Sequence, residues 1–155
     1  MNPLQPLMTL LGQCERERDE FALACQQADM AHRRAAEQAS QLVIYRSEYE
    51  QRWSLQFKTD GRMELVNCYR GFMERLTHAV EQQQAVVTHA QAHLERARLA
   101  LRDGEIRVAS VRKLIERRVA EARLSADRRD QKATDEFAQR AAWNRQHAQG
   151  RADAY

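Results

Sequence analysis

One heptad line of apolar residues limits what this chain can fold into more than any other feature of its sequence. Counting in sevens from Val66 to Ala122 meets nine apolar residues in succession. A companion line, which starts three residues later at Tyr69, is also largely apolar. Apolar residues at two positions of every heptad, about 3.5 residues apart on average, form the seam of a coiled coil. The sequence therefore predicts a helix over about 63–147.

The first third of the chain carries a second seam of the same period. The heptad line from Leu4 to Trp53 is apolar at five of its eight positions, and the line from Leu7 to Tyr49 is apolar throughout. Both prolines lie within the first six residues, so no proline interrupts a helix after them. We expect a first helix over about 4–56.

Between the two seams lies Asp60-Gly61, the strongest turn signal in the chain. A turn at about 57–62 folds the helices into an all-α, long antiparallel two-helix coiled-coil hairpin. Facing residues then have numbers that add up to about 121, because the seams pair residue by residue. The second helix has no partner after about residue 118, so we expect this C-terminal helix to project. Residues 1–155 are expected to form a single coiled-coil domain.

The composition agrees with long helices and excludes several other classes. Charged residues make up 30% of the 155 residues and aromatic residues only 6%, which is typical of coiled coils. The net charge of +3 is too small to indicate nucleic-acid binding. Residues 94–145 nevertheless carry 14 Lys or Arg against 9 Asp or Glu. This basic excess indicates an exposed helix or, more specifically, one that meets an acidic partner; a nucleic-acid-binding coiled coil is the alternative from another class.

The cysteines and the hydropathy pattern point to the cytosol. Cys14, Cys25 and Cys68 are odd in number and form no CxxC pair, so neither a disulfide framework nor a zinc site is expected. No signal peptide is recognised at the N-terminus. The longest apolar run, "LVIY" at 42–45, is too short to span a bilayer.

No motif of a catalytic or cofactor site is present. GxxxxGK[ST], GxGxxG and HExxH are all absent, so we expect no enzyme, no catalytic residue and no cofactor. His89 and His93 are spaced to share a helix face, but they lack a further clear ligand. We interpret them as a surface pair and expect no metal site.

A second apolar line lies beside the seam of the second helix and consists of Leu65, Phe72, Ala79 and Val86. Its middle members belong to a ridge with i, i+4, i+7, i+11 spacing, and the antiparallel register brings a ridge of the same spacing alongside it. Together the ridges predict a composite apolar and aromatic patch, which comprises Gln38, Leu42, Tyr45, Tyr49, Phe72, Leu76, Ala79 and Gln83. This patch is either a docking surface or a thickened core in which Phe72 and Tyr45 cover each other.

Four segments resemble one known family in the right order along nearly the whole chain. They read "PLMTLLGQCERERDE", "LVIYRSEYEQRW", "CYRGFMERLTHAVEQQ" and "RRDQKATDEFAQRAA". The chain resembles the FliJ family, the stalk-like soluble component of the flagellar type III export apparatus. The equivalent stalk of a virulence-type secretion system is the alternative, and the "DEFAQRAA" segment favours the flagellar one.

This resemblance implies a fold similar to the rotor stalk of rotary ATPases and a non-enzymatic role. Members of the family bind the centre of the hexameric export ATPase and promote its assembly. They also contact the cytoplasmic domain of the membrane export gate and help to recycle export chaperones. The implied location is cytoplasmic, and peripheral on the cell membrane at the flagellar base, through these partners.

Carried over residue by residue, the family's gate-docking surface falls on the eight residues of the composite patch. One departure is Gln83, where some relatives have histidine. The ATPase-contacting end falls on the open end of the hairpin, near both termini. Its implied contacts are Leu7, Leu11, Arg128, Gln131, Lys132, Asp135, Glu136 and Phe137.

Overall fold

The computed structural model describes residues 2–154, and within this range it contains two long α-helices and no strand. Helix α1 spans Gln5–Thr59 and helix α2 spans Met63–Ala152. The all-α fold class is therefore confirmed. α1 continues to Thr59 beyond the expected end near residue 56, and α2 continues to Ala152 beyond residue 147, because no proline stops either helix there.

Residues 60–62 connect the two helices in a short polar turn. The Thr59 hydroxyl donates a hydrogen bond of 2.9 Å to the carbonyl oxygen of Gln56 at the end of α1. The Asp60 carboxylate accepts a hydrogen bond of 3.4 Å from the backbone N–H of Arg62, and Arg62 Nε lies 3.5 Å from the same oxygen. Asp60 thus satisfies a donor just before α2, as a capping residue does. The turn lies where Asp60-Gly61 predicted it.

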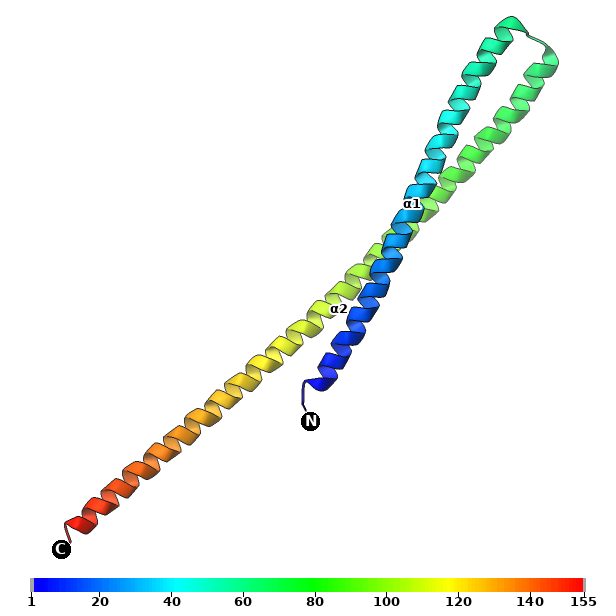
Figure 1. Ribbon diagram of the computed structural model, residues 1–155. Coiled ribbons are helices and arrows are strands. Elements are labelled where there is room, and N and C mark those ends of the chain that lie inside the picture. The colour runs from blue at the N-terminus through cyan, green and yellow to red at the C-terminus, as the bar shows by residue number, and fades with distance from the viewer. Residues whose placement is uncertain (1, 155) are drawn as a thin grey trace. The chain divides into compact units, whose positions relative to one another are not determined.

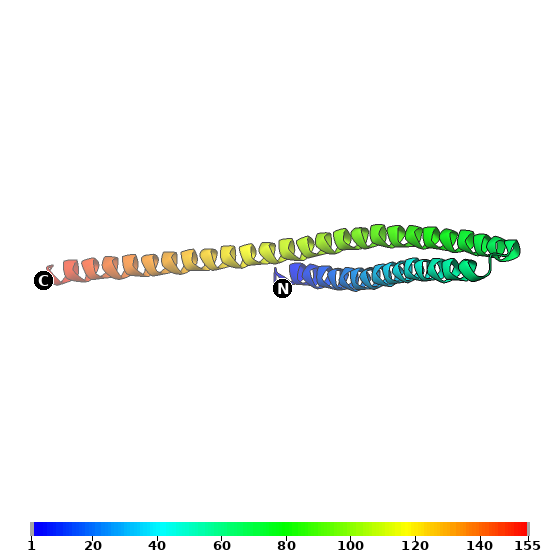
Figure 2. The same ribbon diagram turned by 90° about the horizontal axis from the view of Figure 1, so that it is seen from above.

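Residues 13–108 form one compact unit, in which α1 and α2 lie side by side and antiparallel (Figures 1 and 2). The rings of Tyr49 and Phe72 have centroids 4.3 Å apart, and Gln83 Nε2 lies 3.3 Å from Gln38 Oε1. In both pairs the residue numbers add up to the predicted total. The register expected from the two seams is therefore confirmed in this unit.

The core of this unit consists of residues from the predicted seam lines. Its most enclosed side chains are Cys14, Ala28, Ala35, Ala39, Leu76, Leu94 and Val108. α1 contributes small side chains and α2 contributes larger ones, so the core is thin. Because a two-helix interface encloses few residues on all sides, most other seam residues are only half-buried.

Gly104 marks a place where the two helices approach closely. A Cβ atom at this position would lie 3.0 Å from Cδ2 of Phe21 and 3.4 Å from Cα of Arg18. Both neighbours belong to α1. A glycine in the companion line, which the heptad count alone left unexplained, therefore makes room for the Phe21 ring.

Residues 2–12 and 109–154 make up a second compact unit. The side-chain oxygen of Asn2 accepts a hydrogen bond of 3.1 Å from the backbone N–H of Leu4, just before α1 begins. Asn2 and Leu4 line a shallow depression together with Arg118 and Ala122 of α2, so these segments are neighbours. Val111 is the buried residue of this unit.

From Ala120 to Ala154 every residue is exposed except Ala141, which is half-buried. This part of α2 lacks the buried stripe that stabilises most helices in proteins. That it projects beyond a hairpin, and that the whole chain forms a single domain, stay predictions.

Candidate protein interaction surfaces

The eight residues of the composite patch all lie in the unit of residues 13–108, four on each helix. The structure joins the two ridges at two points. Phe72 packs on Tyr49, with an angle of 33° between the rings, and Gln83 donates to Gln38 further from the turn. The two ridges therefore form one continuous surface, as their spacing predicted.

Burial differs among the patch residues. Leu76 is only 7% exposed and belongs to the core beneath the surface, whereas Tyr45 is 44% exposed. Leu42, Tyr49, Phe72 and Ala79 are half-buried, and Gln38 is exposed. The ring that packs on Phe72 is that of Tyr49, and the ring of Tyr45 is tilted by 46° to the ring of Tyr49, with centroids 5.6 Å apart. Tyr45 therefore remains accessible, which favours a docking surface over a thickened core.

The aromatic cluster extends beyond the predicted patch toward the turn. The ring centroids of Trp53 in α1 and Tyr69 in α2 lie 5.6 Å apart. The ring of Phe57 meets the ring of Tyr69 edge to face, with centroids 5.3 Å apart. Sequence reasoning assigned Trp53 and Tyr69 to the seam and overlooked Phe57. The signal was the i, i+4 spacing of four aromatic residues in α1, at 45, 49, 53 and 57.

Two ion pairs join the helices at points further from the turn than the apolar patch. Arg98 lies 4.0 Å from Asp29, and Arg107 lies 3.7 Å from Glu17. Both arginine side chains are mostly exposed, so each pair adds little to stability.

The second candidate surface lies in the unit of residues 2–12 and 109–154. Leu7 and Leu11 are half-buried, whereas all six candidate residues of α2 are exposed. Phe137 is 76% exposed, the largest value among the exposed hydrophobic residues of the described chain. Gln131 donates a hydrogen bond of 3.5 Å to Asp135 one turn further on. The surface thus presents one bare aromatic ring among the mixed charges of Arg128, Lys132, Asp135 and Glu136.

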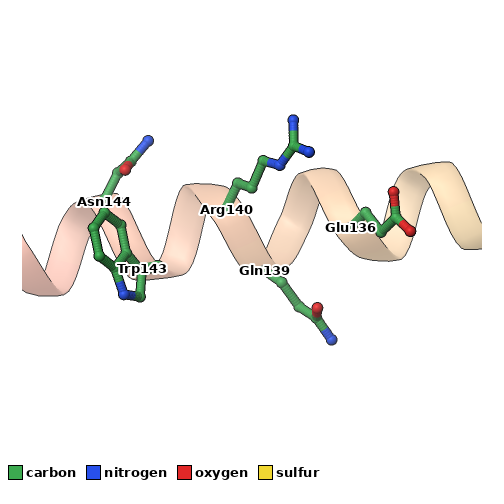
Figure 3. A pocket seen from close by; sticks show the side chains of 5 residues that line it. All are labelled: Glu136, Gln139, Arg140, Trp143 and Asn144. Atoms are coloured by element: carbon green, nitrogen blue, oxygen red, sulfur yellow. The ribbon is translucent and has the colours of Figure 1, made fainter.

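An exposed tryptophan near the end of α2 was not singled out by sequence reasoning. Trp143 is 59% exposed, and its ring stacks on His147 with centroids 3.7 Å apart. Residues from successive turns of α2 line the depression beside it, and their side chains point in different directions (Figure 3). Such a depression is open to solvent and does not enclose a substrate.

No arrangement of side chains in the described residues 2–154 brings together three or more His, Cys, Asp or Glu that could hold a metal ion. Across the same range, neither helix has a segment long and apolar enough to cross a membrane. The surfaces that the described chain does offer are apolar and charged areas of its two helices, which suit contacts with other proteins.

Comparison with known proteins agrees with this assignment. The model of the family described as "Flagellar FliJ protein" matches residues 3–147. The Flagellar FliJ protein of Salmonella typhi is 30% identical over 136 residues, which cover 88% of this chain and 92% of that protein. The Flagellar FliJ protein of Escherichia coli K12 is 28% identical over the same shares of the two chains. The family model covers nearly the whole chain, and the protein therefore belongs to the flagellar FliJ family.

Proposed function

We propose that this protein is the soluble, non-enzymatic stalk of the flagellar type III export apparatus. In this role it binds the centre of the hexameric export ATPase, promotes assembly of the ring, and couples it to the cytoplasmic domain of the export gate. It also assists the recycling of export chaperones. It acts in the cytoplasm and reaches the membrane only through its partners. The family match is to flagellar proteins, which favours this role over the stalk of a virulence-type system.

The observation that carries the gate-docking part is the continuous apolar surface across both helices. Tyr45 stands exposed beside the Tyr49–Phe72 contact, and the exposed side chain of Val86 extends the apolar area along α2. Gln38 and Gln83 provide polar groups at its edge. Exposed aromatic residues with a polar rim are typical of protein interfaces, where a few such side chains supply most of the binding energy.

We assign the contacts with the ATPase ring to the unit of residues 2–12 and 109–154. Phe137 is largely exposed, and the residues before it in α2 carry charges of both signs, which suits a helix surrounded by the polar wall of a ring. Leu7 and Leu11 of the N-terminal turn are the other proposed contacts with the ring, and they are half-buried within their own unit.

The ATPase part is tested by adding the protein to its co-encoded export ATPase and measuring the hydrolysis rate and the hexamer fraction. Three versions are compared: the full chain, a chain that ends at Ala122, and a double variant with Tyr45→Ala and Phe72→Ala. We expect stimulation by the full chain and by the double variant but none by the shortened chain. If the full chain changes neither quantity, the ring-stalk mechanism is wrong.

The gate part is tested by binding to the isolated cytoplasmic domain of the gate protein. The Tyr45→Ala, Phe72→Ala variant is expected to lose binding by at least about tenfold, because interface aromatic residues are frequent hot spots. In the matched control, alanine replaces Val43 and Leu99. These side chains are 44% and 55% exposed and lie outside the patch. Equal losses for the two variants would rule out a specific patch.

A further inference from the structure

Helix α2 carries two neighbouring apolar lines of similar size between residues 65 and 87. The seam line contains Val66, Met73, Val80 and Val87, and the second line contains Leu65, Phe72, Ala79 and Val86. Each member of one line is the chain neighbour of a member of the other. The free energy gained from apolar burial depends on the area removed from water, which is similar for both lines. Apolar burial alone therefore does not decide which line faces α1.

The structure nevertheless selects one rotation of α2. At about 100° per residue, the companion line with Leu76 and Gln83 lies between the two apolar lines on the helix surface. Leu76 is buried, Val87 is half-buried, and Val86 is 50% exposed. Leu65, Phe72 and Ala79 of the second line are half-buried like the seam line, and Phe72 packs on Tyr49. The companion line thus faces α1, and the second line lies at one edge of the interface, where Val86 is exposed.

The ambiguity ends beyond residue 87. There the second line continues with His93, Ala100 and Arg107, while the seam line continues with the buried Leu94 and Val108. A rotation that buried the second line would bury the guanidinium of Arg107, which now pairs with Glu17 at the surface. Only the part of α2 nearer the turn needs a further determinant of its rotation.

Gln83 lies near the boundary of this ambiguous part and makes polar contacts across the interface. Its Nε2 donates to the carbonyl oxygen of Ala35 at 3.1 Å and to Oε1 of Gln38 at 3.3 Å. Both acceptors belong to one turn of α1. Rolling α2 to bury the second line more deeply would move this amide away from both acceptors. An amide buried without partners is costly, so single polar residues in coiled-coil seams determine helix alignment.

We propose that Gln83 is a positioning residue that sets the rotation of α2 against α1 and keeps the second line at the edge of the interface, with Val86 more exposed than its seam neighbour Val87. The consequence for gate docking rests on the proposed function. The rotation itself does not, and it is measured without any partner.

The test uses thiol labelling of the full-length chain with its three native cysteines replaced by alanine. Single cysteines are introduced at Val86 in the second line, Val87 in the seam line and Ala90 in the companion line. The maleimide reaction rate of each is measured with Gln83 present, with Gln83→Ala, and with Gln83→Met, which keeps the side-chain length but lacks the amide. Gln84→Ala is the matched control, since Gln84 is the exposed neighbour.

With Gln83 present, the cysteine at 86 is expected to react fastest. In both Gln83 variants the cysteine at 87 is expected to react about fivefold faster, a factor typical of losing one interior hydrogen bond, while the cysteine at 90 keeps its rate. Gln84→Ala is expected to change none of the three rates. An unchanged rate at 87 overturns the proposal. So does equal acceleration at 87 and 90, because that indicates separation of the helices and not rotation.

Discussion

Single residues decide how closely the two helices approach. In the interior of a helix, glycine costs roughly 1 kcal/mol relative to alanine, so a glycine there needs a compensating reason. For Gly104 the reason is the ring of Phe21, whose Cδ2 atom lies only 3.0 Å from the position that a Cβ atom would take. Gly71, in the same helix, has no atom within 4 Å of its would-be Cβ and so has no such reason.

Gly104→Ala and Gly71→Ala are therefore expected to differ in their effect on stability. Gly71→Ala should raise the free energy of unfolding by about 1 kcal/mol through helix propensity. Gly104→Ala should fall short of that gain by about 1–3 kcal/mol, because the added methyl group overpacks against Phe21 and the Arg18 backbone. Urea unfolding followed by circular dichroism measures both. Equal gains would show that the close approach imposes no constraint.

Replacing each of the two tyrosines of the patch with alanine is expected to lower stability by different amounts, because the two side chains differ in exposure. Tyr49 contacts the rings of Tyr45, Trp53 and Phe72, and its replacement by alanine should lower the free energy of unfolding by about 2–4 kcal/mol. Tyr45→Ala, at an exposed position, should cost less than about 1 kcal/mol. Thermal unfolding of the two variants provides the comparison. A larger loss for Tyr45 would place it in the core.

At the scale of the element, α2 is one continuous helix with two different environments. Its part within residues 13–108 packs on α1, and its part after Ala120 is almost wholly exposed. A helix without tertiary packing depends on intrinsic propensity and on pairs one turn apart, such as Gln131 with Asp135. The exposed part should therefore exchange its amide hydrogens much faster than the packed part.

Ending the chain at Ala122 is expected to leave the urea midpoint of the remaining protein nearly unchanged. The removed residues bury almost nothing, so their loss should shift the free energy of unfolding by less than about 1 kcal/mol. The far-UV ellipticity should fall by the contribution of the removed helix. Hydrogen exchange of the full chain supplies the control, with least protection after residue 122. A large drop in midpoint would mean that this segment is packed in solution.

At the scale of the whole molecule, charge is abundant but contributes little to stability. The chain carries 25 basic and 22 acidic residues, and the ion pairs between the helices in the unit of residues 13–108 lie at the surface. Surface pairs are screened by salt and typically contribute between about 0 and 1 kcal/mol each. The fold therefore depends mainly on the apolar seam and the aromatic cluster near the turn.

Raising the salt concentration from about 0.05 to 0.5 M is expected to change the free energy of unfolding by less than about 2 kcal/mol, since only exposed pairs are screened. Asp29→Asn, which removes the partner of Arg98 while keeping its size, should cost at most about 1 kcal/mol. Urea titrations at both salt concentrations test this. Unfolding by moderate salt alone would contradict the dominance of the apolar seam.

The alternative of a nucleic-acid-binding coiled coil has its own test. If the chain binds an added nucleic acid and this binding falls steeply as the salt concentration rises, that alternative is supported.

The sequence alone was sufficient for the helices, the turn and the register, because each depends on short-range rules. A heptad line continues or stops residue by residue, Asp60-Gly61 interrupts it, and matching seam lengths leave one antiparallel pairing. It also placed Gln38 opposite Gln83 and Tyr49 opposite Phe72. Three outcomes came from the tertiary structure alone. Gly104 accommodates Phe21, Leu76 lies beneath the patch while Tyr45 stays exposed, and Phe57 joins the aromatic cluster. These outcomes depend on the distance and rotation between two helices, which a periodic pattern on each helix does not contain.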